Sequence, residues 1–329
     1  MRLAACLPVL IALMPLPALS DVTDVLRDHV RPATAGFADA TRALAEAAER
    51  DCTATALRPA YQDSFDAWMG LSHLGLGPLE QDGRALTVEF WPDPRGLVSR
   101  TVRGLVANAD PAVEYPQEFA QVSIAGRGLM ALELLIYGDD AGYGADDYAC
   151  RYAAAIAADL AAIAQAVQDD WQDHAQLMLA AGEDGNDRYL SPREPQQAFY
   201  TALLSALEFD ADQRLGRPMG SFDKPRPKLA EAWRSDRPQR NIVLSLQALR
   251  DLALDLAARP LPATEAAFAT ALATVRSLDD PRLGGVATPQ GRLKAEILAQ
   301  QIRAVGDAVR AEIGGQLGLT AGFNSKDGD

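Results

Sequence analysis

Apolar residues recur at helical spacing along most of the chain, and this periodicity constrains the fold more than any other feature. Val22, for example, is followed by Val25 and Leu26, the spacing that places side chains on one face of an α-helix. Glycine and proline, which end helices, separate the periodic segments, as at 75–78. Strand patterns are almost absent, with 86–90 as a short candidate, so an all-α fold is expected. The pattern predicts helices over residues 22–48, 54–74, 94–108, 117–137, 145–181, 194–215, 237–258, 264–278 and 289–314.

The predicted helices divide into two groups at the polar loop 182–187. A chain of 329 residues has the length of about two domains. We therefore expect two four-helix-bundle-like domains in tandem, one over residues 21–185 and one, with a C-terminal tail, over residues 186–329. A weak internal similarity fits a duplication: the pairs Leu76-Gly77 and Leu215-Gly216 are each followed by proline.

The first twenty residues are typical of a secretory signal peptide. Arg2 is the only charged residue before Asp21, residues 3–13 are apolar, and Ala18 and Ser20 provide a small-x-small end. This pattern predicts cleavage after Ser20 and a periplasmic protein. The apolar run is too short for a membrane anchor and is followed by prolines. No transmembrane segment is expected in the mature chain.

Removal of a signal peptide would leave two cysteines, Cys52 and Cys150. In an oxidising compartment, two cysteines most simply form one disulfide. The alternative is a pair of metal-binding thiols. We expect the disulfide because the predicted compartment is oxidising.

Charge and motif content exclude several classes of protein. The formal net charge of -14, from 45 acidic and 31 basic residues, argues against nucleic-acid binding, which needs a basic surface. No His-Glu-x-x-His, Gly-x-Ser-x-Gly, Walker or Cys-x-x-Cys motif occurs. Of the three histidines, His29 and His174 lie in polar stretches and are expected to be solvated. His73 precedes the break at 75–78, where it is expected either to cap a helix end or to face a cleft.

One acidic residue lies in the most apolar predicted helix. Glu133 follows Met130 by three residues, so the two side chains share a helix face. A buried carboxylate must be paired, protonated or bound to a metal. Pairing with Arg127, Arg100 or Arg103 is the structural explanation, and a metal or substrate role is the functional one.

Several segments resemble the imelysin family, which is named for insulin-cleaving membrane proteases and contains iron-regulated periplasmic proteins. The segment from Gly128 to Glu133 resembles the family's Gly-x-His-x-x-Glu signature. The C-terminal segment 319–329 is similar to the end of a predicted-lipoprotein branch of the family. Further matching segments are Gly77-Pro78, Phe90-Trp91-Pro92-Asp93, Leu134-Leu135-Ile136-Tyr137-Gly138, Cys150-Arg151-Tyr152, Lys224-Pro225-Arg226-Pro227, Ala232-Trp233-Arg234-Ser235 and Arg240-Asn241.

The resemblance implies two helical-bundle domains, export, an association with iron uptake, and a site at the domain interface that includes the signature histidine and glutamate. Here Glu133 is kept, but Met130 stands at the histidine position. A thioether suits Cu(I) better than iron. Three explanations stay open: the metal site is abandoned, the metal is softer than iron, or other ligands such as His73, Glu80 or Asp93 replace the histidine.

Two further segments carry candidate ligand-binding groups. The loop 218–237 and the start of the next helix form a basic island in an acidic chain. It is expected to pair with carboxylates across the domain interface or to hold an anionic ligand, such as a carboxylate-bearing siderophore. In the tail, Asn324 and Asp327 are possible oxygen ligands. The island consists of Lys224, Arg226, Lys228, Arg234, Arg237 and Arg240.

Three functions follow from these features. The first is a non-enzymatic periplasmic component of metal acquisition, which binds a metal ion (iron, or else copper or zinc) or an iron-uptake partner. The second is a structural or interaction module of a transport or redox system without its own metal. The third is a metallopeptidase, which the missing zinc-protease motif and signature histidine disfavour.

Overall fold

The computed structural model describes residues 22–318, and this part of the chain is all-α, as the helical spacing predicts. No strand occurs in it; one isolated bridge joins Ser221 and Lys224. π-helical turns follow α1, α9 and α13. The helices are α1 (Val22–Asp24), α2 (Arg31–Arg50), α3 (Ala54–Met69), α4 (Arg84–Val88), α5 (Leu97–Asn108), α6 (Pro116–Phe119), α7 (Gly128–Tyr137), α8 (Tyr148–Leu179), α9 (Arg193–Phe209), α10 (Gly216–Met219), α11 (Pro238–Leu256), α12 (Pro262–Arg276) and α13 (Pro289–Val309).

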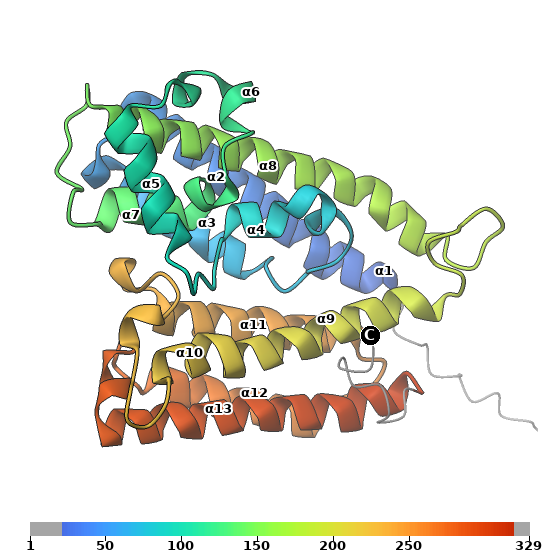
Figure 1. Ribbon diagram of the computed structural model, residues 1–329. Helices are drawn as coiled ribbons and strands as arrows, with labels where there is room; N and C mark the ends of the chain where they lie inside the picture. The colour runs from blue at the N-terminus through green and yellow to red at the C-terminus, as the bar shows by residue number, and fades with distance from the viewer. Residues whose placement is uncertain (1–21, 319–329) are drawn as a thin grey trace, which may run out of the picture.

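Helices α1 to α8 gather in one part of the molecule, which we call the N-terminal half (residues 22–179) (Figure 1). Its centre is the contact of α2 with α8, to which α3 and α7 add. Phe37 and Leu44 of α2 and Ile156 and Leu160 of α8 are completely buried. Burying each such side chain contributes roughly 1.5–3 kcal/mol. Alanine is the best helix former, which suits the alanine-rich α8.

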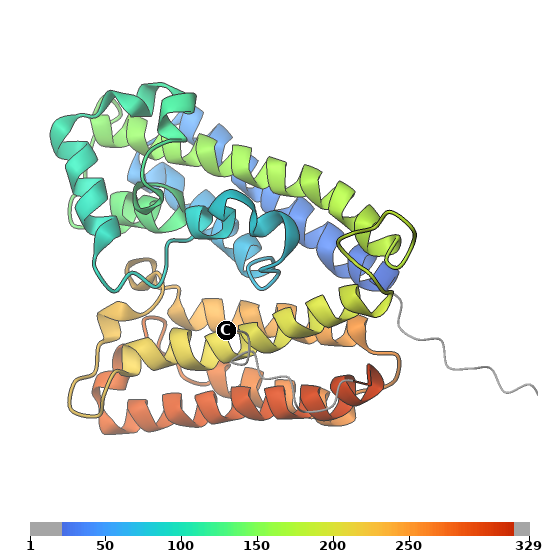
Figure 2. The ribbon, with the colours of Figure 1, turned by 45° about the vertical axis from the view of Figure 1, so that its right-hand side comes forward.

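Helices α9 to α13 form the C-terminal half (residues 193–318), and a second view keeps the two groups of helices apart (Figure 2). Leu249 of α11, Phe268 of α12, and Leu298 and Ile302 of α13 are completely buried in its core. Thr288 caps α13 by accepting a hydrogen bond from the Gly291 amide. The division into tandem domains at residues 185 and 186 remains a prediction.

Among the described residues, α8 alone is long and apolar enough to cross a membrane. Its most apolar window is 44% buried within the fold. Since α8 contacts α2 along its length (Figure 1), it is a central helix of the N-terminal half.

The predicted helix over 117–137 is wrong, because the chain breaks before α7. Residues 124–126 form a single 3-10 turn, and Gly128 then takes a φ of +71°. A Cβ atom at Gly128 would lie 2.0 Å from the Thr87 carbonyl oxygen. Only glycine allows α4 and α7 to approach this closely.

Three other boundaries differ from the prediction. The strand candidate 86–90 is wrong, because α4 covers most of it. The helix expected to reach residue 74 ends at Met69, and the helix expected from residue 94 begins at Leu97. Asp93 fixes the latter start, since its carboxylate accepts hydrogen bonds from the Leu97 and Val98 amides, each at 2.9 Å.

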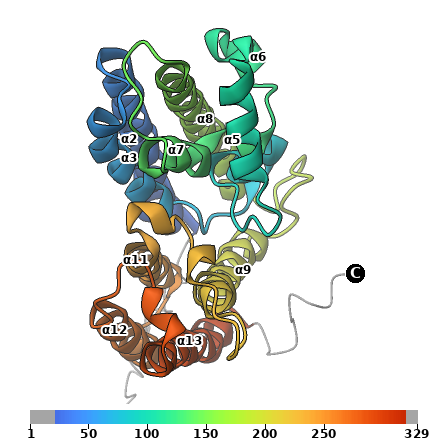
Figure 3. The ribbon, with the colours of Figure 1, turned by 60° about the vertical axis from the view of Figure 1, so that its left-hand side comes forward.

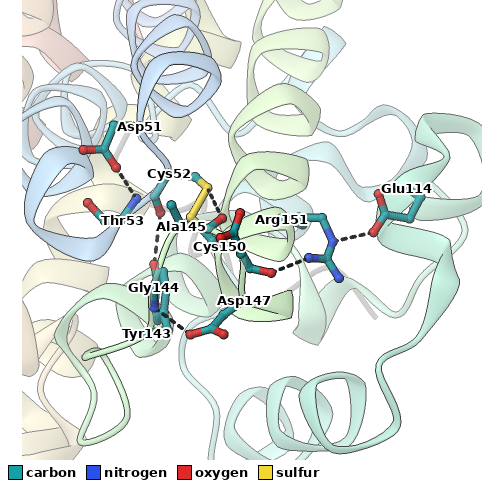
Figure 4. Close-up of a disulfide and its surroundings, with 11 residues drawn as sticks. Asp51, Cys52, Thr53, Glu114, Tyr143, Gly144, Ala145, Asp147, Cys150 and Arg151 are labelled. Atoms are coloured by element: carbon teal, nitrogen blue, oxygen red, sulfur yellow. Dashed lines mark hydrogen bonds and ion pairs between the residues drawn. A yellow bond between two sulfur atoms is a disulfide. The ribbon is translucent and has the colours of Figure 1, made fainter.

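The predicted disulfide between Cys52 and Cys150 is present (Figure 4). It joins the α2–α3 connection to the first turn of α8. The Tyr143 hydroxyl donates to the Cys52 carbonyl oxygen at 3.4 Å, and Arg151 pairs with Glu114 at 2.7 Å. The crosslink therefore lies entirely within the N-terminal half.

Candidate functional site

Polar and charged side chains meet where the two halves touch, and we call this contact the seam. The segment before α11, drawn in orange, lies between α7 and α11 (Figure 3). It brings Ser235 and Arg237 against residues of α3 and α7. The seam therefore joins side chains that are far apart in the sequence.

Glu133 of α7 is completely buried at the seam. Its Oε1 atom accepts hydrogen bonds from the Ser235 amide at 3.0 Å and from the Ser235 hydroxyl at 2.8 Å. Its Oε2 atom accepts none in the described part of the chain and lies 3.9 Å from Arg234 Nη1. Burial raises the pKa of Glu133, while the Ser235 hydroxyl and the Arg234 charge lower it. One carboxylate oxygen is thus held in place and the other is left without a donor.

The expected pairing of Glu133 with Arg127, Arg100 or Arg103 is wrong. Arg127 instead donates to both carboxylate oxygens of Asp159 on α8, at 2.6 and 2.9 Å. Arg127 precedes the first residue of α7, so its side chain does not lie on the same helix face as Glu133.

Tyr61 of α3 lies close enough to the same carboxylate to feel its charge. The completely buried Tyr61 ring lies 5.6 Å from the Tyr137 ring. Burial raises the pKa of Tyr61 well above its usual value, and the charge of Glu133 adds to this. Gln62 donates to the Tyr137 hydroxyl at 2.9 Å and to the Ser235 carbonyl oxygen at 3.1 Å. These contacts fix the position of Ser235, and through it that of Glu133.

Part of the basic island pairs across the seam, as expected. Arg237 is completely buried, pairs with Asp66 of α3 at 2.6 Å, and lies over the Phe65 ring at 4.4 Å. Arg240 pairs with the same carboxylate. Both arginines lower the pKa of Asp66 against the opposing effect of its burial.

A second buried charge cluster, which is not predicted from the sequence, contains Arg214, Asp210, Glu231 and Glu89. Arg214 contacts Asp210 at 2.5 Å and Glu231 at 3.0 Å, and all three side chains are at least 95% buried. Glu89 accepts a hydrogen bond from the Trp68 indole at 2.6 Å. Burial raises the pKa of Glu89 well above its usual value, and the charge of Glu231 raises it further. The sequence does contain a signal for this cluster. Arg214 follows Asp210 by four residues, a spacing that places both side chains on one otherwise apolar helix face.

The structure does not bring the five predicted metal ligands together. Met130 packs beside the core near Glu133 on the same helix. Glu80 is 59% exposed and lies 4.0 Å from Arg188, and Asp93 caps α5. Within residues 22–318, no group of three or more His, Cys, Asp or Glu side chains is arranged to hold a metal ion. A metal ion at the seam would need donor atoms from outside the described residues.

The expectation that His29 and His174 are solvated is wrong, since each is only 7% exposed. His29 Nε2 lies 2.7 Å from Nε2 of His73, itself buried, and His174 Nε2 lies 2.9 Å from the Tyr189 hydroxyl. The other ring nitrogen of His29 is 3.9 Å from Asp255 of α11. His73 thus forms a buried pair with His29.

We expect all three histidines to remain neutral well below pH 6.5. Burial lowers the pKa of His29 and His174 to about 4 and that of His73 well below its usual value. Their neutral forms therefore stabilise the fold fully above the unfolded pKa of about 6.5, and this stability is lost as the pH falls toward 4. Imidazole NMR signals should stay unshifted from pH 8 to 5.5, whereas the chain in urea should titrate near 6.5. Titration of a folded-state histidine above pH 6 would contradict this expectation.

The remaining residues of the segments that resemble the imelysin family lie in surroundings different from those of Glu133. The Trp91 ring contacts Phe209 of α9 across the seam, with ring centres 5.7 Å apart. The Trp233 ring lies 4.7 Å from the Arg234 guanidinium, and the Arg226 amide donates to the Pro218 carbonyl oxygen at 2.8 Å. Asn324 and Asp327 lie outside the described residues.

A half-open pocket of about 450 Å³ lies beside the seam. Helices α5 and α7, the α7–α8 loop and the start of α8 form most of its wall, and Arg234 is the one contribution from the C-terminal half. Because Arg234 also faces Glu133, the pocket and the buried carboxylate share a residue. This arrangement can bind a small molecule next to the seam.

Comparison with known proteins agrees with this fold. The family model for imelysin matches residues 30–309. The crystal structure of an imelysin-like protein from Psychrobacter arcticum 273-4 matches with a TM-score of 0.75 at 20% identity, over 94% of this chain and 98% of that chain. No curated protein matches the sequence. Since the family model covers most of the chain, the chain belongs to the imelysin family.

Proposed function

We propose that this imelysin-family protein is an exported, non-enzymatic component of metal acquisition that binds a metal, or a molecule bearing one, at the seam. The observation that carries the proposal is Glu133. Its Oε1 atom is held by Ser235 of the other half, while its buried Oε2 atom has no hydrogen-bond donor among residues 22–318 and lies 3.9 Å from Arg234. Burying a carboxylate oxygen without a partner is costly unless a proton or cation satisfies it.

Donor chemistry favours a metal-bearing molecule over a bare ion. The described residues offer no set of three or more ligands, and Met130 beside Glu133 provides only a soft thioether. A carrier molecule that already coordinates iron, copper or zinc would supply the missing donor atoms. The pocket next to Arg234 gives such a molecule room at the seam.

Two features, one of the sequence and one of the structure, support the proposal that the protein is exported. The pattern over residues 1–20, which lie outside the described part of the chain, predicts a signal peptide cut after Ser20. The Cys52–Cys150 disulfide fits a periplasmic protein, because disulfides persist in oxidising compartments. The partners would then be periplasmic components of iron uptake.

The proposal is tested by metal titration of the mature protein. We expect Fe²⁺, ferric citrate, Cu⁺ or Zn²⁺ to bind, and the affinity to fall at least tenfold in Glu133→Gln, since one charged contact is worth roughly 1.5–3 kcal/mol. Gln keeps an acceptor for Ser235, so the fold should persist, as thermal unfolding would verify. Glu80→Gln removes an exposed carboxylate and should leave binding unchanged.

Two results would overturn the proposal. If none of the four probes binds, the protein is instead an interaction module without its own metal. If Glu133→Gln binds as tightly as the wild type, the seam carboxylate is not the site. Cleavage of a denatured protein substrate that a chelator abolishes would instead support the metallopeptidase alternative.

A further inference from the structure

Two arginines line the pocket beside the seam, and their guanidinium groups have no hydrogen-bonded acceptor in the part of the chain that the structure describes. Arg103 of α5 is exposed and forms no ion pair or side-chain hydrogen bond among the described residues. Arg234 lies 3.9 Å from Glu133 Oε2, beyond hydrogen-bonding distance, and is stacked on Trp233. The guanidinium fork matches a carboxylate geometrically. The pocket therefore offers two cationic groups to an anion.

The surrounding wall is largely apolar. Val102 and Val106 of α5 and Leu134 and Leu135 of α7 line the pocket. Val106 is 38% exposed although it is a large apolar residue. Covering these side chains with an apolar ligand body removes water from them, which favours binding.

Aspartates limit how much negative charge a ligand can carry. Asp139, Asp140 and Asp147 also line the pocket, from the α7–α8 loop. The Asp147 carboxylate already accepts a hydrogen bond from the Gly144 amide at 2.6 Å. None of the three forms an ion pair with Arg103 or Arg234, so basic and acidic groups contribute separately to the lining. Because these aspartates repel negative charge, the pocket favours a ligand with one carboxylate over a ligand with several.

We propose that the pocket binds an organic monocarboxylate with an aromatic or aliphatic body. Arg103 and Arg234 hold the carboxylate, and Val102, Val106, Leu134 and Leu135 contact the body. This proposal deepens the proposed function and rests on it in one respect: Arg234, which also faces Glu133, would bring the carboxylate-bearing molecule to the seam.

The experiment compares two isosteric probes by titration calorimetry, naphthalene-2-carboxylate and its neutral carboxamide. The carboxylate should bind at least roughly tenfold more tightly, because a charged hydrogen bond is stronger than a neutral one. Arg103→Gln and Arg234→Gln should each remove most of this preference. Arg276→Gln, an exposed arginine of α12, is the matched control and should leave binding unchanged.

Three outcomes would overturn the proposal: equal affinity for the two probes, unchanged affinity in both pocket variants, or preferential binding of 2-naphthylmethylamine lost in Asp139→Asn with Asp140→Asn. This test and the metal titration of the proposed function can fail independently of each other. Carboxylate binding without metal binding would reject the proposed function alone, and Glu133-dependent metal binding without a carboxylate preference would reject this inference alone.

Discussion

Replacing Arg214 with methionine is expected to lower the free energy of unfolding by about 3–5 kcal/mol. The guanidinium lies between Asp210 and Glu231, which are completely or almost completely buried. Methionine fills similar volume but leaves two buried carboxylates without a counter-charge. Removing one partner of a buried ion pair is strongly destabilising because it leaves an uncompensated buried charge. Urea unfolding measures the difference directly.

The loss in Arg214→Met should depend on pH. Burial raises the pKa of Asp210 against the opposing charge of Arg214, so without the arginine the folded-state pKa of Asp210 should rise further. The protonated form of Asp210 is then favoured in the fold, so the variant should lose stability as the pH rises above the unfolded carboxyl range near 4. Unfolding at pH 5 and pH 8 separates this effect from packing alone. Arg303→Met removes an exposed pair with Asp212 and should cost less than about 1 kcal/mol. An equally small loss in Arg214→Met would contradict the expectation.

Removing the disulfide is expected to cost about 4–5 kcal/mol on the chain-entropy model. The bond joins residues with a sequence separation of 98, so its loss gives the unfolded chain much more freedom. Urea unfolding of oxidised wild type, reduced wild type and a double variant, Cys52→Ala with Cys150→Ala, measures the cost.

The reduced wild type is the control, because it keeps both thiols and lacks only the crosslink. Cys150 is completely buried, so alanine there adds a packing loss that the reduced protein does not have. A difference below about 1 kcal/mol between oxidised and reduced wild type would show that the crosslink constrains the unfolded chain little. The hydrogen bonds of Glu133 to Ser235 should persist in either case, because neither cysteine takes part in them.

Apolar spacing along the sequence predicts most helices correctly. It does not predict the local structure where two segments cross in space. Apolar spacing located α2, α3, α8 and the long helices of the C-terminal half. It missed the break before α7, because the cause is the Thr87 carbonyl, which is distant in sequence from Gly128. The same limit applies to the site. Burial of Glu133 follows from its apolar helix, but Ser235, its partner, is 102 residues away and no local pattern points to it.

The histidine predictions failed for a different reason, since a usable signal was present. His29 follows Val25 by four residues, and His174 precedes Met178 by four. Both positions lie on buried helix faces by spacing. Their polar sequence neighbours favour exposure, but helical periodicity decides which side chains face the core.

Gly128 is fixed by crowding of its backbone against α4, and Glu133 by the loop of the opposite half. Met130 lies between them, partly buried, and neither constraint acts on it. The glycine and the glutamate of the family signature therefore meet two different structural requirements, and the position between them meets neither. A search pattern that requires all three would pass over chains of this kind. One that keeps the glycine and the glutamate and leaves the middle position open would retain them.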